Sequence, residues 1–145
     1  LSFERRFNVR VEPKSAYKIF DLGALPNRPN TFDAALNDQG AVLADAAASA
    51  SGRSRRTFVF EGLESGGTIT EVGTLAGTTS SGAGLNNLGV VIGTSLNAQG
   101  ASRTFVRDPA SGALREVGTL VGGTNSFGTA IRTTATKRCS RCATT

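Results

Sequence analysis

Few residues of this chain have the types and spacing that chemistry at a site requires. Cys139 and Cys142 form a Cys-x-x-Cys pair, which in proteins is half of a zinc site or a redox pair. The chain has no histidine, and no second cysteine pair completes the set. Tyr17 is the only tyrosine, and we find neither a nucleophile paired with a base nor a Gly-rich phosphate loop with a lysine. The sequence therefore predicts no catalysis, no bound metal and no cofactor.

One basic cluster, GRSRR, lies in the body of the chain. Its arginines, Arg53, Arg55 and Arg56, are weak candidates for contact with an anionic glycan or a phosphate. The alternative is a solvated loop whose charge is screened by the glutamates that follow, Glu61 and Glu64. We prefer the solvated loop, because charge runs on a surface rarely need a ligand to explain them.

The net charge of +5 invites a nucleic-acid interpretation, but its location argues against one. Of 16 basic residues, four lie in residues 132–145, which hold no acidic residue. The remaining 12 basic and 11 acidic residues leave the body with a net charge of +1. Nucleic-acid binding is therefore not expected. No apolar run approaches the length of a membrane span, and no signal peptide is visible at Leu1.

An internal repeat organises the chain, and the pentapeptide EVGTL marks it at 71–75 and 116–120. Asp21, Glu71 and Glu116 begin equivalent segments, spaced 50 and 45 residues apart. Periods of this size are typical of propeller blades, solenoid coils or array units. The predicted divisions are a leading segment (1–19), repeats over 20–131 (units of about 20–70, 71–115 and a partial 116–131) and a non-repeat tail (132–145).

Each unit is expected to form four short strands joined by tight turns. In the second unit the predicted strands are the region around Gly82–Leu85, then Val90–Leu96, the SRTFVR segment and Leu114–Leu120. The turn sequences NNLG, NAQG and DPASG place Asn, Asp, Pro and Gly where turns require them. No stretch shows a sustained helical period with caps. The prediction is an all-β fold of antiparallel four-stranded, propeller-like blades forming an incomplete propeller. A stacked β-solenoid is the alternative.

The residues that recur between units are best explained by structure. Leu36, Leu85 and Ile131 are equivalent and are expected to face the core between blades, where Phe58 and Phe105 pack as well. Their turns end at Gly40 and Gly89. A functional alternative would make the Asn turns a ring of calcium or sugar contacts. It is weak, because Asn side chains in turns usually bond to their own backbone.

The repeated pieces FDLGALP, ALNDQGAVLAD and RTFVF return as EVGTLAG, GLNNLGVVIGTS and RTFVR, and then as EVGTLVGGTNSFGTAI. This pattern, from Tyr17 to Ile131, resembles the HAF repeat family of mostly bacterial extracellular repeat proteins. Thr57 and Thr104 stand where that family often has histidine, so any role of that histidine is not carried over. The resemblance implies a secreted or surface-exposed repeat protein with no assigned catalytic residues.

The last residues, RTTATKRCSRCATT, do not continue the repeat. In a shifted reading frame their codons permit a segment close to LNDQGAVLAD, which suggests a frameshift. The alternative is a natural divergent tail. Basic, rich in threonine and poor in apolar residues, the tail is expected to be disordered. On the frameshift hypothesis, the cysteine pair carries no function.

The function expected from these observations is a non-enzymatic extracellular repeat module for binding or surface display, with an unknown ligand or partner protein. One alternative is part of a sialidase-like propeller enzyme whose active residues lie outside this chain. Another is a basic binder of anions or nucleic acid. Because an incomplete array exposes strand edges, we also expect self-association through them.

Overall fold

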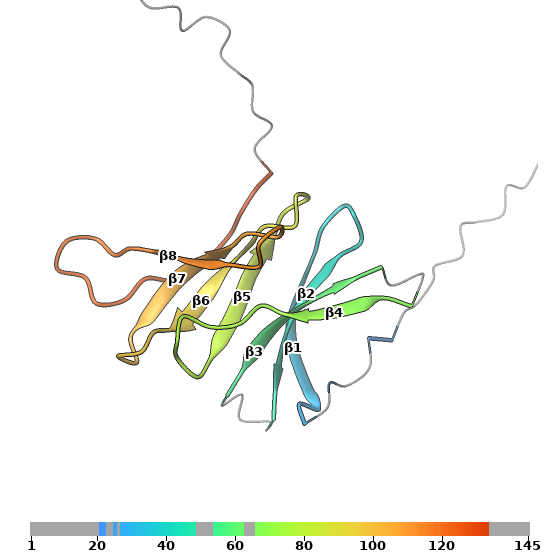
Figure 1. Cartoon of the computed structure of the whole chain (residues 1–145), viewed down its shortest axis with the longest axis horizontal. Coiled ribbons are helices and arrows are strands. Elements are labelled where there is room, and N and C mark those ends of the chain that lie inside the picture. Colours follow the sequence, from blue (N-terminus) through green and yellow to red (C-terminus); the bar gives the residue numbers. More distant parts are fainter. Residues whose placement is uncertain (1–20, 23–24, 26, 49–53, 63–65, 134–145) are drawn as a thin grey trace, which may run out of the picture.

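The structure, a computed structural model, describes residues 21–22, 25, 27–48, 54–62 and 66–133, which form two four-stranded antiparallel sheets (Figure 1). In each sheet the spatial order of the strands follows the chain. None of the described residues lies in a helix, so this part of the chain contains no helix that could cross a membrane. The all-β prediction with antiparallel four-stranded units is confirmed. The first sheet comprises β1 (Asn30–Leu36), β2 (Val42–Ala47), β3 (Arg56–Glu61) and β4 (Thr68–Glu71), and the second comprises β5 (Ser80–Leu85), β6 (Val91–Leu96), β7 (Ser102–Arg107) and β8 (Leu114–Val117).

Three turns of the sequence type Asn-x-x-Gly connect strands in the same way. In each, the side-chain oxygen of the asparagine (Asn37, Asn86 or Asn97) accepts hydrogen bonds from two backbone N–H groups further along the turn, at 2.9 to 3.1 Å. The glycines Gly40 and Gly89 both have a φ of 77°, a left-handed conformation that costs a residue without a Cβ little. The predicted turns are therefore confirmed, and the asparagine oxygens serve their own backbone.

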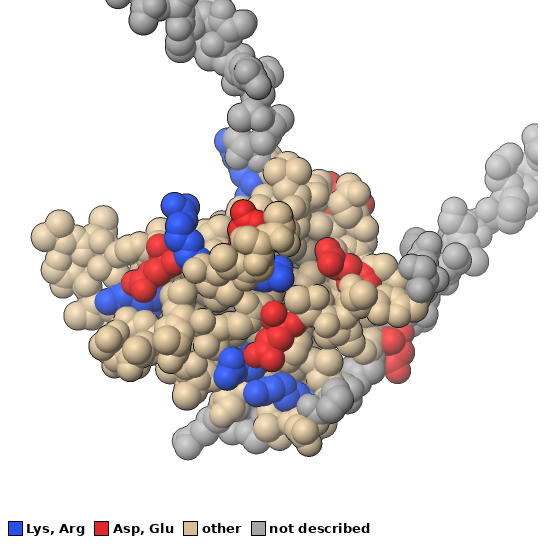
Figure 2. All heavy atoms as spheres, viewed as in Figure 1, with Lys and Arg blue, Asp and Glu red and all other residues tan. Residues whose placement is uncertain are grey.

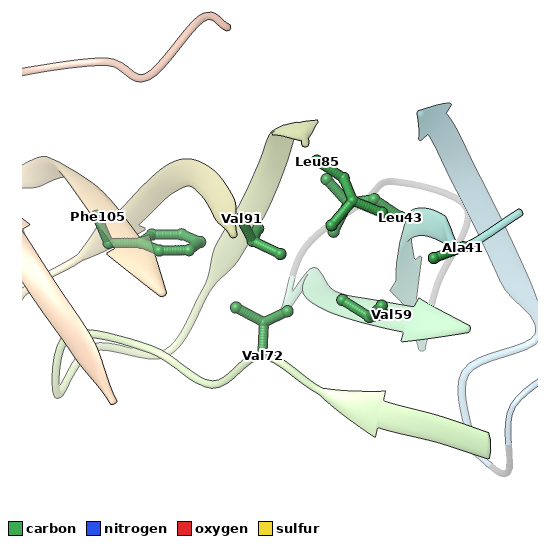
Figure 3. Packing of buried hydrophobic residues seen from close by; sticks show 7 residues of the cluster. All are labelled: Ala41, Leu43, Val59, Val72, Leu85, Val91 and Phe105. Carbon is green, nitrogen blue, oxygen red and sulfur yellow. The ribbon is translucent and has the colours of Figure 1, made fainter. Parts of the chain in front are cut away.

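The inner strands of the first sheet are covered on both faces. Opposite residues of an antiparallel pair share a face, and the register pairs Leu43 with Val59 and Ala44 with Phe58. Leu43 and Val59 face the second sheet, where they join a cluster that also holds Leu85 (Figure 3). The cluster consists of Ala41, Leu43, Val59, Val72, Leu85, Val91 and Phe105, and it fills the space between the sheets.

The opposite face of the first sheet holds a second cluster, of Ala44, Ala46, Phe58 and Phe60. Leu22 and Leu25 pack against it. These leucines come one and four residues after Asp21, as Val72 and Leu75 come one and four residues after Glu71. Val72 and Leu75 pack in the cluster that contains Phe105. The residues that follow each acidic repeat marker therefore cover the aromatic residue of the sheet that comes next.

Two predictions about core positions are corrected. Leu36 was expected to face a core between blades, but 70% of its surface is exposed. Its counterpart Leu85 is buried because it contacts the face of the first sheet, and no described sheet precedes β1 to cover Leu36 in that way. Phe58 is buried as predicted, although it lies in the second cluster and not between the two sheets. Phe105 is fully buried between the sheets, and Ile131 is half-buried.

Candidate functional site

A hollow at the junction of the two sheets is lined almost entirely by hydroxyl side chains. Its volume is about 250 Å³. Arg55, which precedes β3, contributes the one charged side chain of the lining. The other residues come from the residue before β5, the beginning of β5, the end of β6 and the beginning of β7: Thr79, Ser80, Ser81, Thr94, Ser95, Leu96 and Ser102. We call this hollow the junction pocket.

The carboxylate of Asp45 organises the floor of this junction. The side chain is 1% exposed, and one of its oxygens accepts hydrogen bonds from the Thr57 hydroxyl at 2.7 Å and from the backbone N–H of Gly82 at 2.9 Å. The other oxygen accepts a hydrogen bond from the Ser81 hydroxyl at 2.7 Å. A buried carboxylate is costly unless such donors satisfy it. Asp45 therefore binds the first sheet to β5 through donors from both sheets.

The two described arginines of the basic cluster both have carboxylate partners. A terminal guanidinium nitrogen of Arg55 lies 3.7 Å from Asp45, and its guanidinium carbon lies 4.8 Å from the ring centre of Phe32. Arg56 forms an ion pair with Glu71 at 3.1 Å. Arg53 lies outside the described residues. The structure therefore places Arg55 at the junction pocket and Arg56 at the beginning of β3, where it pairs with Glu71 of the neighbouring strand β4.

The Arg56–Glu71 pair has a counterpart in the second sheet. Arg103 and Glu116 occupy the same repeat positions, and their side chains lie 2.8 Å apart. The glutamate that begins each EVGTL segment thus pairs with the arginine that precedes the Thr-Phe dipeptide. This gives the repeated charges a structural role, although exposed pairs of this kind typically stabilise by only about 0.2–1 kcal/mol.

Charged side chains of both signs lie on the face of the molecule that Figure 2 draws. On the face drawn in Figure 2, arginine and acidic side chains lie next to one another and form no large patch of one sign. Phosphate backbones are bound by clustered positive charge, so this face gives no support to nucleic-acid binding. Among the described residues, no group of three or more His, Cys, Asp and Glu side chains is placed to hold a metal ion. Cys139 and Cys142 lie outside those residues.

A second hollow, of about 470 Å³, lies at the β7–β8 end of the second sheet and is lined by Val90, Val106, Asp108, Ser111, Ala113 and Arg115. The backbone N–H groups of Ser111 and Ala110 donate to the Asp108 carboxylate at 3.0 and 2.8 Å. These hydrogen bonds, led by that of Ser111, lower the pKa of Asp108. They belong to the DPASG turn, which is explained by its own backbone.

The region after β8 contacts the second sheet as β5 contacts the first. The backbone N–H of Thr57 donates to the Ser80 hydroxyl at 3.1 Å, and that of Thr104 donates to the Ser126 hydroxyl at 2.9 Å. Ser80 and Ser126 each lie five residues before the repeat positions Leu85 and Ile131. The junction between consecutive units is therefore built twice from equivalent positions.

The most connected residue of the junction, Asp45, was missed by sequence reasoning. One signal was present, because an aspartate interrupts the apolar run VLADAA of a predicted inner strand. Serines that later prove to be junction contacts gave no signal, since serine is common in this chain. Comparisons with protein-family models, with curated proteins and with solved structures give no match for this chain.

Proposed function

We propose that this chain is a non-enzymatic repeat module whose sheets are propeller-like blades, and that it binds a hydroxyl-rich ligand of the saccharide class in the junction pocket. The observation that carries the proposal is the lining of that pocket by serine and threonine hydroxyls at the meeting point of two sheets. Each hydroxyl can donate one hydrogen bond and accept two. Several of them already bond within the protein and are therefore held in fixed positions, which favours recognition of a ligand with several hydroxyls.

The charge of the pocket favours a neutral ligand. The guanidinium of Arg55 is the one cationic group of the lining, and the buried carboxylate of Asp45 lies 3.7 Å from it. Because these opposite charges are so close together, their net electrostatic attraction for a sulfate or phosphate group is weak. The hollow has a volume of about 250 Å³, which is below the range of about 300–1,000 Å³ that is usual for ligand pockets. It therefore suits a small ligand such as a single sugar ring. A neutral saccharide is thus favoured over an anionic glycan.

We further propose an extracellular or cell-surface location, which rests on the resemblance to HAF repeat proteins. Detection of the chain in the culture medium or the surface fraction of cells that express it naturally would support this location. Recovery from the cytoplasm alone would contradict it.

NMR titration of the chain with neutral, uronic and sulfated oligosaccharides tests the proposed ligand. We expect shifts at Thr79, Ser95 and Ser102 with neutral sugars. Thr79→Leu would fill the pocket and weaken binding by at least about tenfold, or 1.4 kcal/mol. Thr70→Leu is the matched control, because Thr70 lies exposed on β4 and does not line the pocket.

Three outcomes would contradict the binding proposal: no saccharide shifts these resonances, Thr79→Leu and Thr70→Leu bind equally well, or only sulfated sugars bind. The last outcome would favour an anion binder. Cleavage of an oligosaccharide by the purified chain would favour an enzyme instead.

A further inference from the structure

The segment that follows β8 occupies the place of a first strand, and none of the strands that the structure describes pairs with it. In the first junction, the N–H of Gly82 donates to Asp45 and Ser80 bonds to Thr57. In the second junction, the N–H of Gly128 donates to the Thr94 hydroxyl at 3.1 Å, and Ser126 bonds to Thr104. Residues 126–131 therefore contact the second sheet through the same repeat positions with which β5 contacts the first.

The close approach at this contact is repeated as well. A Cβ on Gly82 would lie 2.8 Å from a methyl carbon of Leu43, and a Cβ on Gly128 would lie 3.0 Å from a side-chain carbon of Ile92. Leu43 and Ile92 occupy the same repeat position. Distances this short exclude any larger residue unless the neighbours shift. Gly128 thus allows residues 126–131 to pack as closely against the second sheet as β5 packs against the first.

Among the described strands, none pairs with one edge of this segment. β5 pairs along its length with β6, from Ser80 opposite Ser95 to Leu85 opposite Val91. The equivalent residues 126–131, all of which the structure describes, belong to no strand. A segment that pairs with no described strand offers backbone N–H and C=O groups on that edge to another strand.

Apolar side chains beside that edge are exposed where their counterparts are covered. Val117 and Leu120 are 41% and 89% exposed. Val72, which occupies the repeat position of Val117, is 2% exposed and packs in the cluster that contains Phe105. Phe127, in the segment itself, is 67% exposed. We call Val117, Leu120, Phe127 and the edge of residues 126–131 the terminal face.

We propose that the terminal face is the docking surface for a further four-stranded sheet of the same kind. Its second strand would pair with residues 126–131, and the phenylalanine of its third strand would pack on Val117 and Leu120. The two internal precedents show this arrangement: Leu22 and Leu25 beside Phe58, and Val72 and Leu75 in the cluster of Phe105. The inference rests on the repeated junction alone and depends neither on saccharide binding nor on closure of a ring.

A second copy of this chain does not fit the terminal face. In another copy, β2 lies between β1 and β3, and β6 lies between β5 and β7, so neither strand has a free edge. Phe58 and Phe105 of that copy are likewise buried by its own residues. A second copy could supply the required strand and aromatic residue only by opening its own sheet. The occupant must therefore be an additional sheet with the Asn-x-x-Gly turn and the Thr-Phe dipeptide.

The test inserts a second copy of residues 86–131 directly after Ile131 in the full chain. The original segment 126–131 then becomes the first strand of a complete third sheet. We expect backbone amides of the original residues 118–131 to exchange at least about tenfold more slowly than in the parent chain, as measured by hydrogen-exchange mass spectrometry on peptides that run from this segment across Ile131 into the added copy and so differ from those of the added copy. The matched control is the same insertion with Phe105→Ser in the added copy only, which should lose this protection.

A substitution on the existing face gives a second, independent readout. Leu120→Glu should leave the Tm of the parent chain nearly unchanged, because Leu120 is exposed. In the extended chain it should lower the Tm by about 5 °C or more, since the charge would be buried. Equal effects in both chains, unchanged exchange of residues 118–131, or an added sheet that does not fold would each overturn the proposal. Protection in the parent that rises with protein concentration would identify a second copy as the occupant and overturn it too.

Discussion

The backbone N–H of Gly128 donates to the hydroxyl of Thr94, at the repeat position where the N–H of Gly82 donates to the carboxylate of Asp45. Thr94 and Asp45 each lie nine residues after the repeat positions Leu85 and Leu36. The equivalent glycine N–H therefore donates to a neutral hydroxyl in one junction and to a buried carboxylate in the other. The first junction depends more heavily on a single side chain, since Asp45 also binds Thr57 and Ser81.

Replacing Asp45 tests that dependence. Asp45→Ala would leave the Gly82 N–H and the two hydroxyls without their acceptor, and Arg55 without its carboxylate. We expect the free energy of unfolding, measured by urea denaturation, to fall by about 3 kcal/mol. Asp45→Thr, which copies the second junction, should lose clearly less. A loss below about 1 kcal/mol for Asp45→Ala would contradict the assigned role.

Glycine at position 93 is required by packing. A Cβ there would lie 2.4 Å from the backbone oxygen of Ser81 and 2.7 Å from the ring of Phe105. Gly93→Ala should therefore destabilise the chain by about 2 kcal/mol through overpacking, with loss of the aromatic signal of Phe105 in NMR spectra. Gly118→Ala is the matched control, because a Cβ there meets no atom within 4 Å. Its effect should stay within about 0.5 kcal/mol. Equal effects of the two substitutions would show that this contact is not tight in solution.

The sequence predicted the strands and turns well, because both are local. Asn-x-x-Gly turns need only their own atoms, and Asn37 and Asn86 bond to the backbone as expected. Strand β8 ends at Val117, whereas the prediction continued it to Leu120. Val117 is the last residue that pairs with β7. The EVGTL motif begins inside the strand and continues beyond it. The motif alone therefore does not show at which residue strand pairing ends.

Positions that depend on a neighbouring unit were harder to predict. Leu36 and Leu85 occupy the same repeat position, but one is exposed and the other buried, because only Leu85 has a described sheet before it to contact. The junction pocket was not predicted either, since its lining comes from separate strands and from residue types that are abundant throughout the chain. Periodicity identifies equivalent residues, while burial depends on which units surround them.

Acid titration tests the Asp108 turn. Hydrogen bonds from Ser111 and Ala110 stabilise the ionised carboxylate and lower its pKa in the folded chain. Because the folded pKa lies below the unfolded one, this contribution is present above the unfolded pKa and is lost as the pH falls through the folded pKa. NMR titration of the Asp108 carboxyl carbon should give a lower midpoint in the native chain than in urea. The stability difference from Asp108→Ala should shrink over the same acidic range. Identical midpoints in both states would contradict the prediction.

A comparison of two asparagine turns can distinguish the stability that comes from the turn itself from the stability that comes from a hydrogen bond between the two sheets. The side-chain oxygens of Asn37 and Asn97 accept equivalent backbone hydrogen bonds, but the Asn37 amide group also donates to the backbone oxygen of Asn86 in the second sheet, at 3.0 Å. Asn97→Ala should cost about 1 kcal/mol and Asn37→Ala about 2 kcal/mol in urea denaturation.

Aspartate at the same two positions isolates the bridge. It keeps the oxygens that the turn needs and removes the amide donor, so Asn97→Asp should be nearly neutral. Asn37→Asp should lose about 1 kcal/mol or more, because a carboxylate would then face the backbone oxygen of Asn86. Equal losses at the two positions would show that the amide of Asn37 does not hold the sheets together. A loss confined to Asn37→Asp would show that a turn residue, repeated for local reasons, also joins consecutive units.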